Sequence, residues 1–448
     1  MAHSHRKLIA ASTAVGLVAL TLAGCAPAAS DGRTTIDVWT HEFEPLQASL
    51  LEKWIPEFES ANPDIKINLT TVPLAGVVTY DAKLLASLST GSGPDVWDMG
   101  DWNFGTMIDN GFLAHIDPGT FGYGDQTELV AHYADGVTTS VERDGQLYGM
   151  VNEFNTLRLF YNKDVFAEAG IPELSETTPI SWDEVGQIGQ TLLKEEGGQV
   201  TRMGLQLGFF SNYRAPQWYA QNFYTLMRQY GQDDLYVDGE PAGNTQPVID
   251  ALSLLSQLTH EDRAYDPTFV QNWFADIPQG RAAMVQAGTW YPGAASSNAE
   301  GEFNFGVAPT PVVDPSDPST LKDVSYLWGW AVNAASSSPE QEAAQEFLAF
   351  ILGKKGETDQ AAYWFQELGY LQPTSDFLSS DAYASAVEER PWLQQFIDAL
   401  STYQVGPVQH STDLAGEALI RAIDKITYDA QDPAQVAAEL QRDLERLP

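Results

Sequence analysis

The fold of this chain is decided by residues 36–69, which read IDVWTHEFEPLQASLLEKWIPEFESANPDIKINL. Residues 36–39 are a short apolar run typical of a β-strand, and residues 65–69 alternate apolar and polar as a second strand. Residues 62–64 (Asn-Pro-Asp) mark a turn just before that second strand. Between the strands, apolar residues recur at helical spacing, at Leu46, Leu50, Leu51, Trp54, Ile55 and Phe58. This segment therefore predicts a strand, an amphipathic helix and another strand.

The same alternation of elements continues along the chain. A second helical face is formed by Tyr80, Leu84, Leu85 and Leu88. The turn at residues 91–94 (Gly-Ser-Gly-Pro) then leads into residues 95–97 (Asp-Val-Trp), which we expect to be a third strand. A β-α-β-α-β order with short connections predicts an α/β fold with a mostly parallel sheet covered by helices. Ligands of such sheets bind in loops beyond the carboxyl ends of the strands.

Length and charge restrict the classes of protein that fit. A chain of 448 residues exceeds the usual size of one hydrophobic core, so we expect two lobes. With 61 acidic against 23 basic residues, the formal net charge is −38. A field of that sign repels phosphate backbones and anionic lipid surfaces, so nucleic acid is not an expected partner.

The first 25 residues have the three parts of an export signal. Arg6 and Lys7 form a basic region, residues 8–22 are an apolar run, and Leu22-Ala23-Gly24-Cys25 closes it. The apolar run is short for a bilayer span, which takes about 20 residues. An uncleaved membrane anchor at the N-terminus is the alternative interpretation.

The closing tetrapeptide resembles the bacterial lipobox, in which the cysteine is diacylated and becomes the new N-terminus. We therefore predict a signal peptide over residues 1–24 and a lipid-anchored tether over residues 25–33, with Cys25 as the lipidation site. Cleavage removes two basic and no acidic residues, so the mature charge would be about −40. No later stretch approaches 18 consecutive apolar residues, so we expect an extracytoplasmic protein held at the bacterial cell membrane by its lipid only.

Familiar signatures of catalysis and cofactor binding are missing from the sequence. There is no phosphate-binding loop, no G-x-G-x-x-G after a strand and no G-x-S-x-G elbow. The single cysteine excludes a disulfide framework and a Cys-rich metal site, and no histidines are paired at metal-ligand spacing. We predict no cofactor, no metal and no enzymatic activity. A carboxylate pair for glycoside hydrolysis stays open, because 61 acidic residues place such a pair near any pocket.

The chain resembles the extracellular solute-binding proteins of bacterial ABC importers, in the sugar-binding family that includes maltodextrin-binding protein. Six segments carry the resemblance, in order: IDVWT through FESANPDIKI (36–67), YDAKLLASLSTGSGPDVWDMGDWNFGTMIDNGFLAHID (80–117), DGQLYGMVNEFNTLRLFYNKDVFAEAGI with PISWDEV (144–185), GRAAMVQAGTWYPG (280–293), YLWGWAVNAASSSPEQEAAQEFLAFI (326–351) and GYLQPTSDF (369–377). Each segment alone is a weak match, whereas six in this order behind a lipobox are specific.

The resemblance implies two α/β lobes, a periplasmic-binding-protein-like fold, joined by hinge strands that close around one ligand. We place the crossings between lobes near residues 145–152, 325–332 and 372–378. Lobe 1 is then formed by residues 34–145 and 332–374, and lobe 2 by residues 152–325 and 378–448. The resemblance further implies a monomer that captures a carbohydrate, which we expect to be an oligosaccharide, and delivers it to permease subunits driven by a separate ATPase.

A sugar presents an apolar ring face and a rim of hydroxyls, so its binder needs aromatic planes together with amides or carboxylates. His41 and Glu42 lie at the carboxyl end of the first strand, where a ligand loop is expected, and Trp39 reads equally well as core. Asp101 and Trp102 follow the PDVWDM strand, and the matching loop of the family contacts sugar. A helix N-cap is the other interpretation of Asp101.

Two candidates come from the next parts of the resemblance. Asp81 matches a position where a family relative carries a ligand-binding acid, with a solvated helix start as the alternative. Asn155 lies on the hinge-side segment that reaches the cleft in the family, and its amide can both donate to and accept from hydroxyls. Glu153 is the weaker candidate on this segment.

The candidates of the second lobe are aromatic, and core packing is the alternative for each. Trp218 belongs to a polar-aromatic cluster where the family places a helix end at the cleft. Trp290 matches the family's small-small-Trp turn, in which Gly288 brings the indole to the ligand. Trp328 and Trp330 alternate along a strand and share one face, so at least one is expected to reach the cleft, and we select Trp328.

Other functions remain compatible with these residues. The same fold could bind a polyol, a sugar phosphate or a polyamine, and a secreted glycoside hydrolase is a more distant alternative. A sugar phosphate would call for converging Arg or Lys side chains, which the candidate set lacks. A polyamine would suit the carboxylates of Glu42, Asp81 and Asp101.

Overall fold

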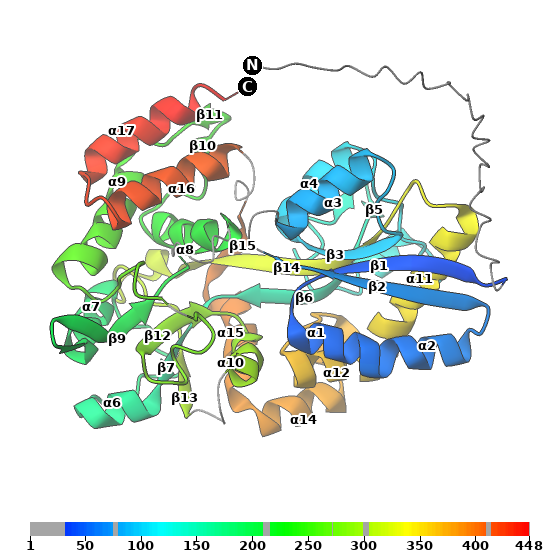
Figure 1. Cartoon of the computed structure of the whole chain (residues 1–448), viewed down its shortest axis with the longest axis horizontal. Coiled ribbons are helices and arrows are strands. Elements are labelled where there is room, and N and C mark those ends of the chain that lie inside the picture. Colours follow the sequence, from blue (N-terminus) through cyan, green and yellow to red (C-terminus); the bar gives the residue numbers. More distant parts are fainter. Residues whose placement is uncertain are drawn as a thin grey trace, which may run out of the picture.

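The computed structural model describes residues 32–74, 79–208, 216–270, 272–298, 304–408 and 414–447. These residues form two α/β lobes side by side, and strands β6 (Met150–Thr156) and β14 (Lys322–Val332) run between them (Figure 1). This confirms the predicted two-lobed α/β fold. The predicted signal peptide (1–24), Cys25 and the tether up to residue 31 lie outside the described residues.

The first sheet combines strands from both ends of the chain. Besides β6 and β14 it contains β1 (Thr34–His41), β2 (Ile65–Val72), β3 (Val96–Gly100) and β15 (Gln404–Pro407). The order is β15-β14-β3-β1-β2, and β6 pairs with β14 beside this path. β1 is parallel to β2 and β3, whereas β14 is antiparallel to β3 and β6. The sheet is mixed rather than mostly parallel because β14 brings the chain back from the other lobe.

The second sheet is also mixed. Its strands, in spatial order, are β13 (Phe305–Ala308), β7 (Arg158–Asn162), β12 (Ala282–Ala287), β9 (Gln199–Gln206) and β8 (Lys194–Glu196). β12 is parallel to β9, and the other neighbours in this sheet are antiparallel. Two short hairpins lie outside the sheets and are formed by β4 (Glu142–Arg143) with β5 (Gln146–Leu147), and by β10 (Tyr236–Val237) with β11 (Glu240–Pro241).

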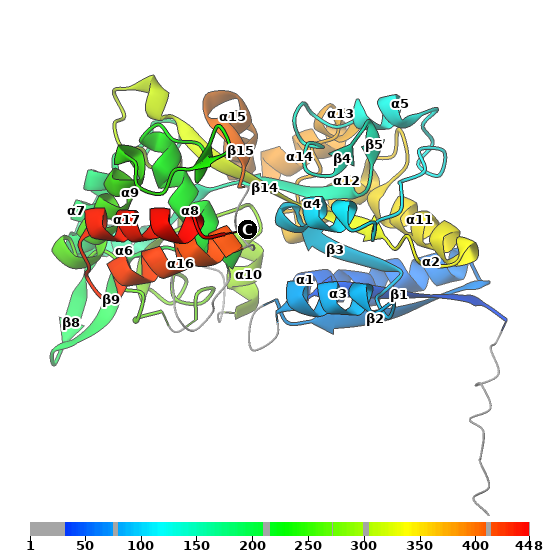
Figure 2. The ribbon, with the colours of Figure 1, turned by 90° about the horizontal axis from the view of Figure 1, so that it is seen from above.

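Helices surround both sheets (Figure 2). Those on the side of the first sheet are α1 (Glu44–Ser49), α2 (Ile55–Ala61), α3 (Tyr80–Ser89), α4 (Asp101–Asp109), α5 (Gln126–Val130), α11 (Ser338–Leu352), α12 (Asp359–Leu368), α13 (Ser375–Leu378) and α14 (Asp381–Glu389). Those on the side of the second are α6 (Lys163–Ala169), α7 (Trp182–Leu192), α8 (Pro216–Gln229), α9 (Gln246–Ser256), α10 (Tyr291–Asn298), α15 (Gln394–Thr402), α16 (Leu414–Thr427) and α17 (Pro433–Leu444). A π-helical turn (Leu50–Trp54) joins α1 to α2.

Several helices begin where the sequence indicates. Ser181 caps α7 in a capping box, in which its side chain accepts from the Glu184 amide and the Glu184 carboxylate accepts from the Ser181 amide. Ser337 and Glu340 form the same motif at the start of α11. These local hydrogen bonds satisfy backbone donors that a helix start leaves open.

Two large hydrophobic cores follow the two lobes, and β14 contributes to both. Leu327 and Trp330 belong to the core of the first lobe, whereas Val324, Tyr326 and Trp328 belong to the core of the second. A smaller cluster joins α12, α13 and α14. Because β14 belongs to both cores, the predicted lobe boundaries near residues 145–152, 325–332 and 372–378 stay a prediction.

A buried ionic network fixes the start of β14. Asp323 is fully buried and accepts from Arg158 Nη1 at 3.3 Å, Thr310 Oγ1 at 2.7 Å and Thr225 Oγ1 at 3.2 Å. Burial lowers the pKa of Arg158 and raises that of Asp323, while the attraction between the two groups opposes both shifts. The network connects β7 and α8 to β14, so it holds the second lobe to the strand that leaves it.

Candidate functional site

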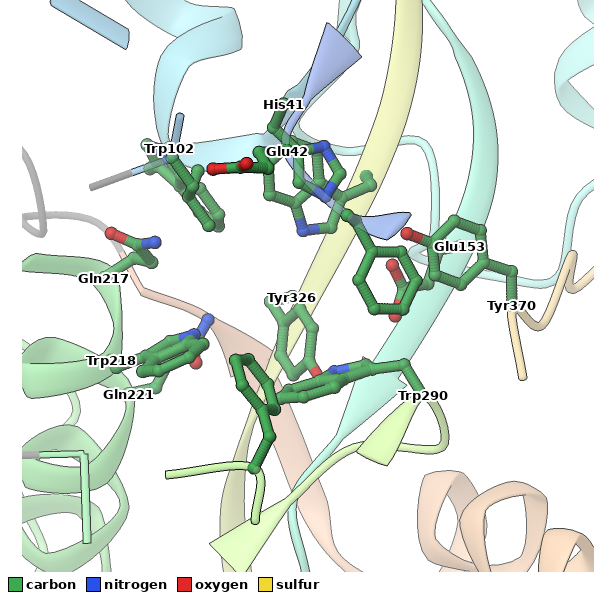
Figure 3. A pocket seen from close by; sticks show the side chains of 14 residues that line it. His41, Glu42, Trp102, Glu153, Gln217, Trp218, Gln221, Trp290, Tyr326 and Tyr370 are labelled. Atoms are coloured by element: carbon green, nitrogen blue, oxygen red, sulfur yellow. The ribbon is translucent and has the colours of Figure 1, made fainter. Parts of the chain in front are cut away.

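A pocket lies between the two lobes, with a volume of about 540 Å³ that includes its open mouth. Its lining comes from the end of β1, the loops after β1 and β2, the start of α4, the neighbouring strands β6 and β14, the helix α8, and the segments before and after β12 and after α12 (Figure 3). The lining residues are His41, Glu42, Phe43, Leu74, Trp102, Glu153, Gln217, Trp218, Gln221, Phe274, Trp290, Tyr326, Trp328 and Tyr370. Eight of these fourteen side chains are Phe, Tyr or Trp, so the pocket is mainly an aromatic one.

His41 stands at the end of β1 and is oriented by a buried carboxylate. Its Nδ1 lies 2.6 Å from Asp98 Oδ2, and its backbone amide donates to Asp98 Oδ1 at 3.0 Å. The imidazole ring packs on Trp328, with 4.0 Å between ring centroids. Tyr80 Oη also donates to Asp98 Oδ1, at 3.1 Å. This arrangement fixes the imidazole, and Nε2 has no hydrogen-bond partner among the residues that the structure describes.

The predicted acids of the α3 and α4 starts lie behind the pocket wall. Asp81 Oδ2 accepts from Trp102 Nε1 at 3.1 Å, so Asp81 orients an indole that does line the pocket. Asp101 is the first residue of α4 and is buried beside β14, where burial raises its pKa to about 8 although backbone amides hydrogen-bond to it. Neither acid lines the pocket. Trp39 does not line it either and lies under Lys83, with Nζ 4.8 Å from the ring centroid.

On β6 the pocket is lined by Glu153, and Asn155 is covered. Asn155 Nδ2 donates to Glu153 Oε1 at 2.7 Å and to Thr289 Oγ1 at 2.8 Å, while its Oδ1 accepts from the Thr289 amide at 3.1 Å. Thr289 Oγ1 in turn donates to the carbonyl of Gly369. Asn155 therefore connects β6 to the turn after β12, and Glu153, which the sequence ranked lower, is the residue that faces the pocket.

The turn after β12 carries Trp290 into the pocket. Its Nε1 donates to Tyr326 Oη at 2.8 Å, and its ring is nearly parallel to that of Trp218, at 10° and 6.1 Å between centroids. A Cβ on Gly288 would lie 2.1 Å from Tyr326 Oη and 2.8 Å from Trp290 Nε1, so only glycine leaves room for this pair. Trp218 and Trp290 are both half-buried, which leaves ring surface for a ligand.

Amides on α8 complement the aromatic rings. Gln217 and Gln221 are one helical turn apart and both line the pocket, although each is largely buried. Their side-chain amides make no hydrogen bond within the described residues, so they are available to a ligand. Figure 3 shows both facing the pocket beside Trp218.

The structure thus brings six of the nine predicted ligand-binding residues to one pocket: His41, Glu42, Trp102, Trp218, Trp290 and Trp328. Asp81, Asp101 and Asn155 lie behind it and hold neighbouring groups. Trp330 is fully buried beneath, and Trp182 is buried with its Nε1 donating to Gln229 Oε1. The lining residues that the sequence did not select are Phe43, Leu74, Glu153, Gln217, Gln221, Phe274, Tyr326 and Tyr370.

Replacing Glu153 by glutamine should change how stability depends on pH. Burial, with a smaller contribution from Asp98, raises the pKa of Glu153 to about 8, against about 4.3 in an unfolded chain. The protonated carboxyl therefore favours the folded state below about pH 4, and this stabilisation is lost as the pH rises through 8. Glutamine does not titrate, so between about pH 4 and pH 8 the free energy of unfolding of Glu153→Gln should rise relative to that of the wild type. The expected rise is up to about 1.4 kcal/mol per pH unit.

Denaturant unfolding of the ligand-free protein at several pH values measures this difference. Asp109→Asn serves as the control, because Asp109 is exposed and forms a surface ion pair with Arg143. A difference between Glu153→Gln and wild type that does not change with pH would contradict the prediction.

Two features are absent from the part of the chain that is described, a metal-ligand cluster and a membrane-spanning helix. No group of three or more His, Cys, Asp or Glu side chains there could hold a metal ion. Within the same residues, no helix combines the length and the apolar character that a membrane crossing requires.

The comparisons with known proteins agree with the geometry. The profile of the family described as bacterial extracellular solute-binding protein matches residues 42–358. The arabinooligosaccharide-binding protein of Bacillus subtilis is 25% identical over 76% of this chain and 74% of its own, and the maltodextrin-binding protein MdxE of the same organism is 24% identical over 79% and 77%. The structure of maltose-bound MalE3 of T. maritima superposes with a TM-score of 0.75 at 17% identity, over 92% of this chain and 99% of that one.

These findings confirm the predicted solute-binding fold, an extracytoplasmic class of protein, and action by binding rather than catalysis. The glycoside hydrolase alternative is thereby not supported. Since the family profile covers well over half of the chain, the protein belongs to the bacterial extracellular solute-binding protein family, the substrate-binding components of ABC transporters.

Proposed function

We propose that this protein is a lipid-anchored binding protein that captures an oligosaccharide for an ABC importer. The observation that carries the proposal is the pocket itself, in which the nearly parallel rings of Trp218 and Trp290 face free amides on α8. Rings of this kind cover the apolar face of a sugar, and amides donate to and accept from its hydroxyls. The relatives that bind arabino-oligosaccharides and maltodextrins support a sugar of more than one unit.

The proposed contacts are His41, Glu42, Trp102, Trp218, Trp290 and Trp328. They come from both lobes, so one ligand can hold the two lobes together. A ligand that contacts both lobes binds the closed arrangement better than an open one and shifts the population toward it. Closure would then present the loaded protein to permease subunits, with a separate ATPase driving import.

A thermal-shift screen of mono-, di- and oligosaccharides tests the proposal on the soluble form that lacks residues 1–25. A ligand present at 100 times its Kd adds about 2.7 kcal/mol to stability, which raises the unfolding midpoint by several degrees. The hit should also be bound in calorimetry with a stoichiometry of one. Sugars of every size and linkage leaving the midpoint unchanged would argue against a sugar ligand.

Changing Cys25 to serine should release the protein from the membrane fraction. The thiol is the only group that a lipoprotein acyl chain could use at this site, and one chain pair is enough for stable anchoring. Ligand affinity should be unchanged, because no proposed contact lies near the N-terminus. Fractionation of cells with an immunoblot measures the distribution, and a serine variant that stays with the membrane would indicate an uncleaved anchor.

A further inference from the structure

Apart from the imidazole of His41, the lining side chains of the pocket that can carry a charge near neutral pH are acidic. Glu42 stands at its rim and Glu153 at its floor, and Asp98 lies directly beneath, bonded to His41. No Lys or Arg side chain lines the pocket among the described residues. Arg158, the buried cation on neighbouring β7, is already paired with Asp323. The floor of the pocket is therefore a region of carboxyl groups that have no Lys or Arg partner among the described residues, and its imidazole, that of His41, is bonded to Asp98.

Glu153 is the centre of this region. The residue is 2% exposed, and Oε1 accepts from Asn155 Nδ2 at 2.7 Å. Oε2 has no hydrogen-bond partner in the described part of the chain, and the residue lines the pocket. A buried carboxyl without a charged partner stays protonated, and burial accordingly raises the pKa of Glu153 to about 8. A positive charge on a ligand would stabilise the carboxylate form and so oppose the effect of burial on the pKa of Glu153.

Aromatic rings surround the carboxyl. Figure 3 shows it between the rings of Tyr326 and Tyr370, and Phe43 stacks on Tyr370 at 15° with 5.9 Å between centroids. Trp328, the cross-strand neighbour of Glu153 on β14, meets Trp102 edge to face. The faces of such rings attract cations, most strongly where water is excluded. A neutral hydroxyl gains little from a ring face, so the combination of rings with a free buried carboxyl oxygen discriminates in favour of an ammonium group.

We infer that the pocket contains a subsite for an ammonium group, placed between Glu153 Oε2 and the rings of Phe43 and Tyr370. Within the sugar class proposed above, the preferred ligand is therefore an amino sugar. The amino-sugar assignment rests on the proposed function, whereas the ammonium subsite itself does not. A neutral sugar that accepts a hydrogen bond from protonated Glu153 is the competing interpretation.

Two matched pairs of probes separate these interpretations in calorimetric or NMR titrations at about pH 6.5, where a sugar amine is protonated. The pairs are glucosamine with glucose, and choline with its neutral isostere 3,3-dimethylbutan-1-ol. We expect the charged member of each pair to bind at least about tenfold more tightly. Glu153→Gln should bring that ratio close to one, because the amide cannot become an anion.

Glu44→Gln is the matched control, because Glu44 is exposed in the first turn of α1, outside the pocket, and its change alters the net charge equally. It should leave the ratio unchanged. Wild-type protein should also release a proton when choline binds, seen as a dependence of the binding enthalpy on the buffer, and Glu153→Gln should not.

Three results would overturn the inference: equal or weaker binding of the charged members, no titration of either ammonium probe up to about 50 mM, or a preference that survives in folded Glu153→Gln. Thermal unfolding confirms that the variant is folded. If neutral oligosaccharides bind as well as charged ones, only the ammonium subsite fails. If choline is preferred but every sugar fails in the screen, only the proposed sugar ligand fails.

Discussion

Trp290→Ala is expected to weaken sugar binding by about 2 kcal/mol or more, which is a loss of roughly 30-fold or more in affinity. The indole lines the pocket, lies nearly parallel to Trp218 and is anchored through Tyr326 Oη. Its removal deletes one aromatic plane and leaves a buried hydroxyl without its donor. Because the ring is half-buried, the ligand-free protein should lose less stability than the 3–5 kcal/mol typical of a core aromatic.

Calorimetric titration with the sugar found in the screen, together with denaturant unfolding without ligand, measures both quantities. Trp39→Ala is the matched control, because Trp39 is also half-buried but lies outside the pocket beneath Lys83. It should leave the affinity within about twofold. If Trp290→Ala is strongly destabilised but binds the sugar normally when folded, Trp290 packs in the core and does not contact the ligand.

Arg158→Met should lower the free energy of unfolding by about 3–5 kcal/mol, because it leaves the fully buried Asp323 carboxylate without its cation. Adding Asp323→Asn removes that uncompensated charge and keeps an oxygen that can accept from the two threonines. The double variant should therefore lose less free energy of unfolding than the two single variants lose together. Urea unfolding of the wild type, Arg158→Met, Asp323→Asn and the double variant gives the coupling free energy directly.

A surface pair provides the comparison. Arg143 lies 3.0 Å from Asp109, and both side chains are about half exposed, at 47% and 64%. Arg143→Met should cost no more than about 1 kcal/mol. Similar losses at Arg158 and Arg143, or additive effects at Arg158 and Asp323, would show that the buried network does not hold β14 as described.

The elements with strong periodicity were predictable from the sequence, and those with none were not. The segment that opens the fold gives β1, the α1–α2 helical segment and β2, because each buries only one face and so carries an alternating or helical pattern. β6, over Met150–Thr156, carries no such pattern. All its residues are buried, including the polar Asn152, Glu153 and Asn155, so its sequence does not alternate between apolar and polar.

Pocket residues could be predicted from the sequence where they directly follow the end of a strand. They could not be predicted where a segment distant in the sequence decides which side chain is covered. His41, Glu42 and Trp102 reach the pocket because β1 and β3 end at the same edge of the sheet. Glu153 and Asn155 share one face of β6, yet Thr289, 134 residues away from Asn155, covers Asn155 and leaves Glu153 open. Gln217 and Gln221 could have been found from their spacing of one helical turn beside Trp218.

The strand shared by both cores also restricts how this protein can diverge from its relatives. Tyr326 and Trp328 touch the ligand space and at the same time belong to the hydrophobic core of the second lobe. A substitution at either residue must keep the lobe folded, whatever it does to ligand preference. Substitutions that change ligand specificity are therefore expected mainly at Glu42 and along α8. The lining residues of β14 are expected to change more slowly.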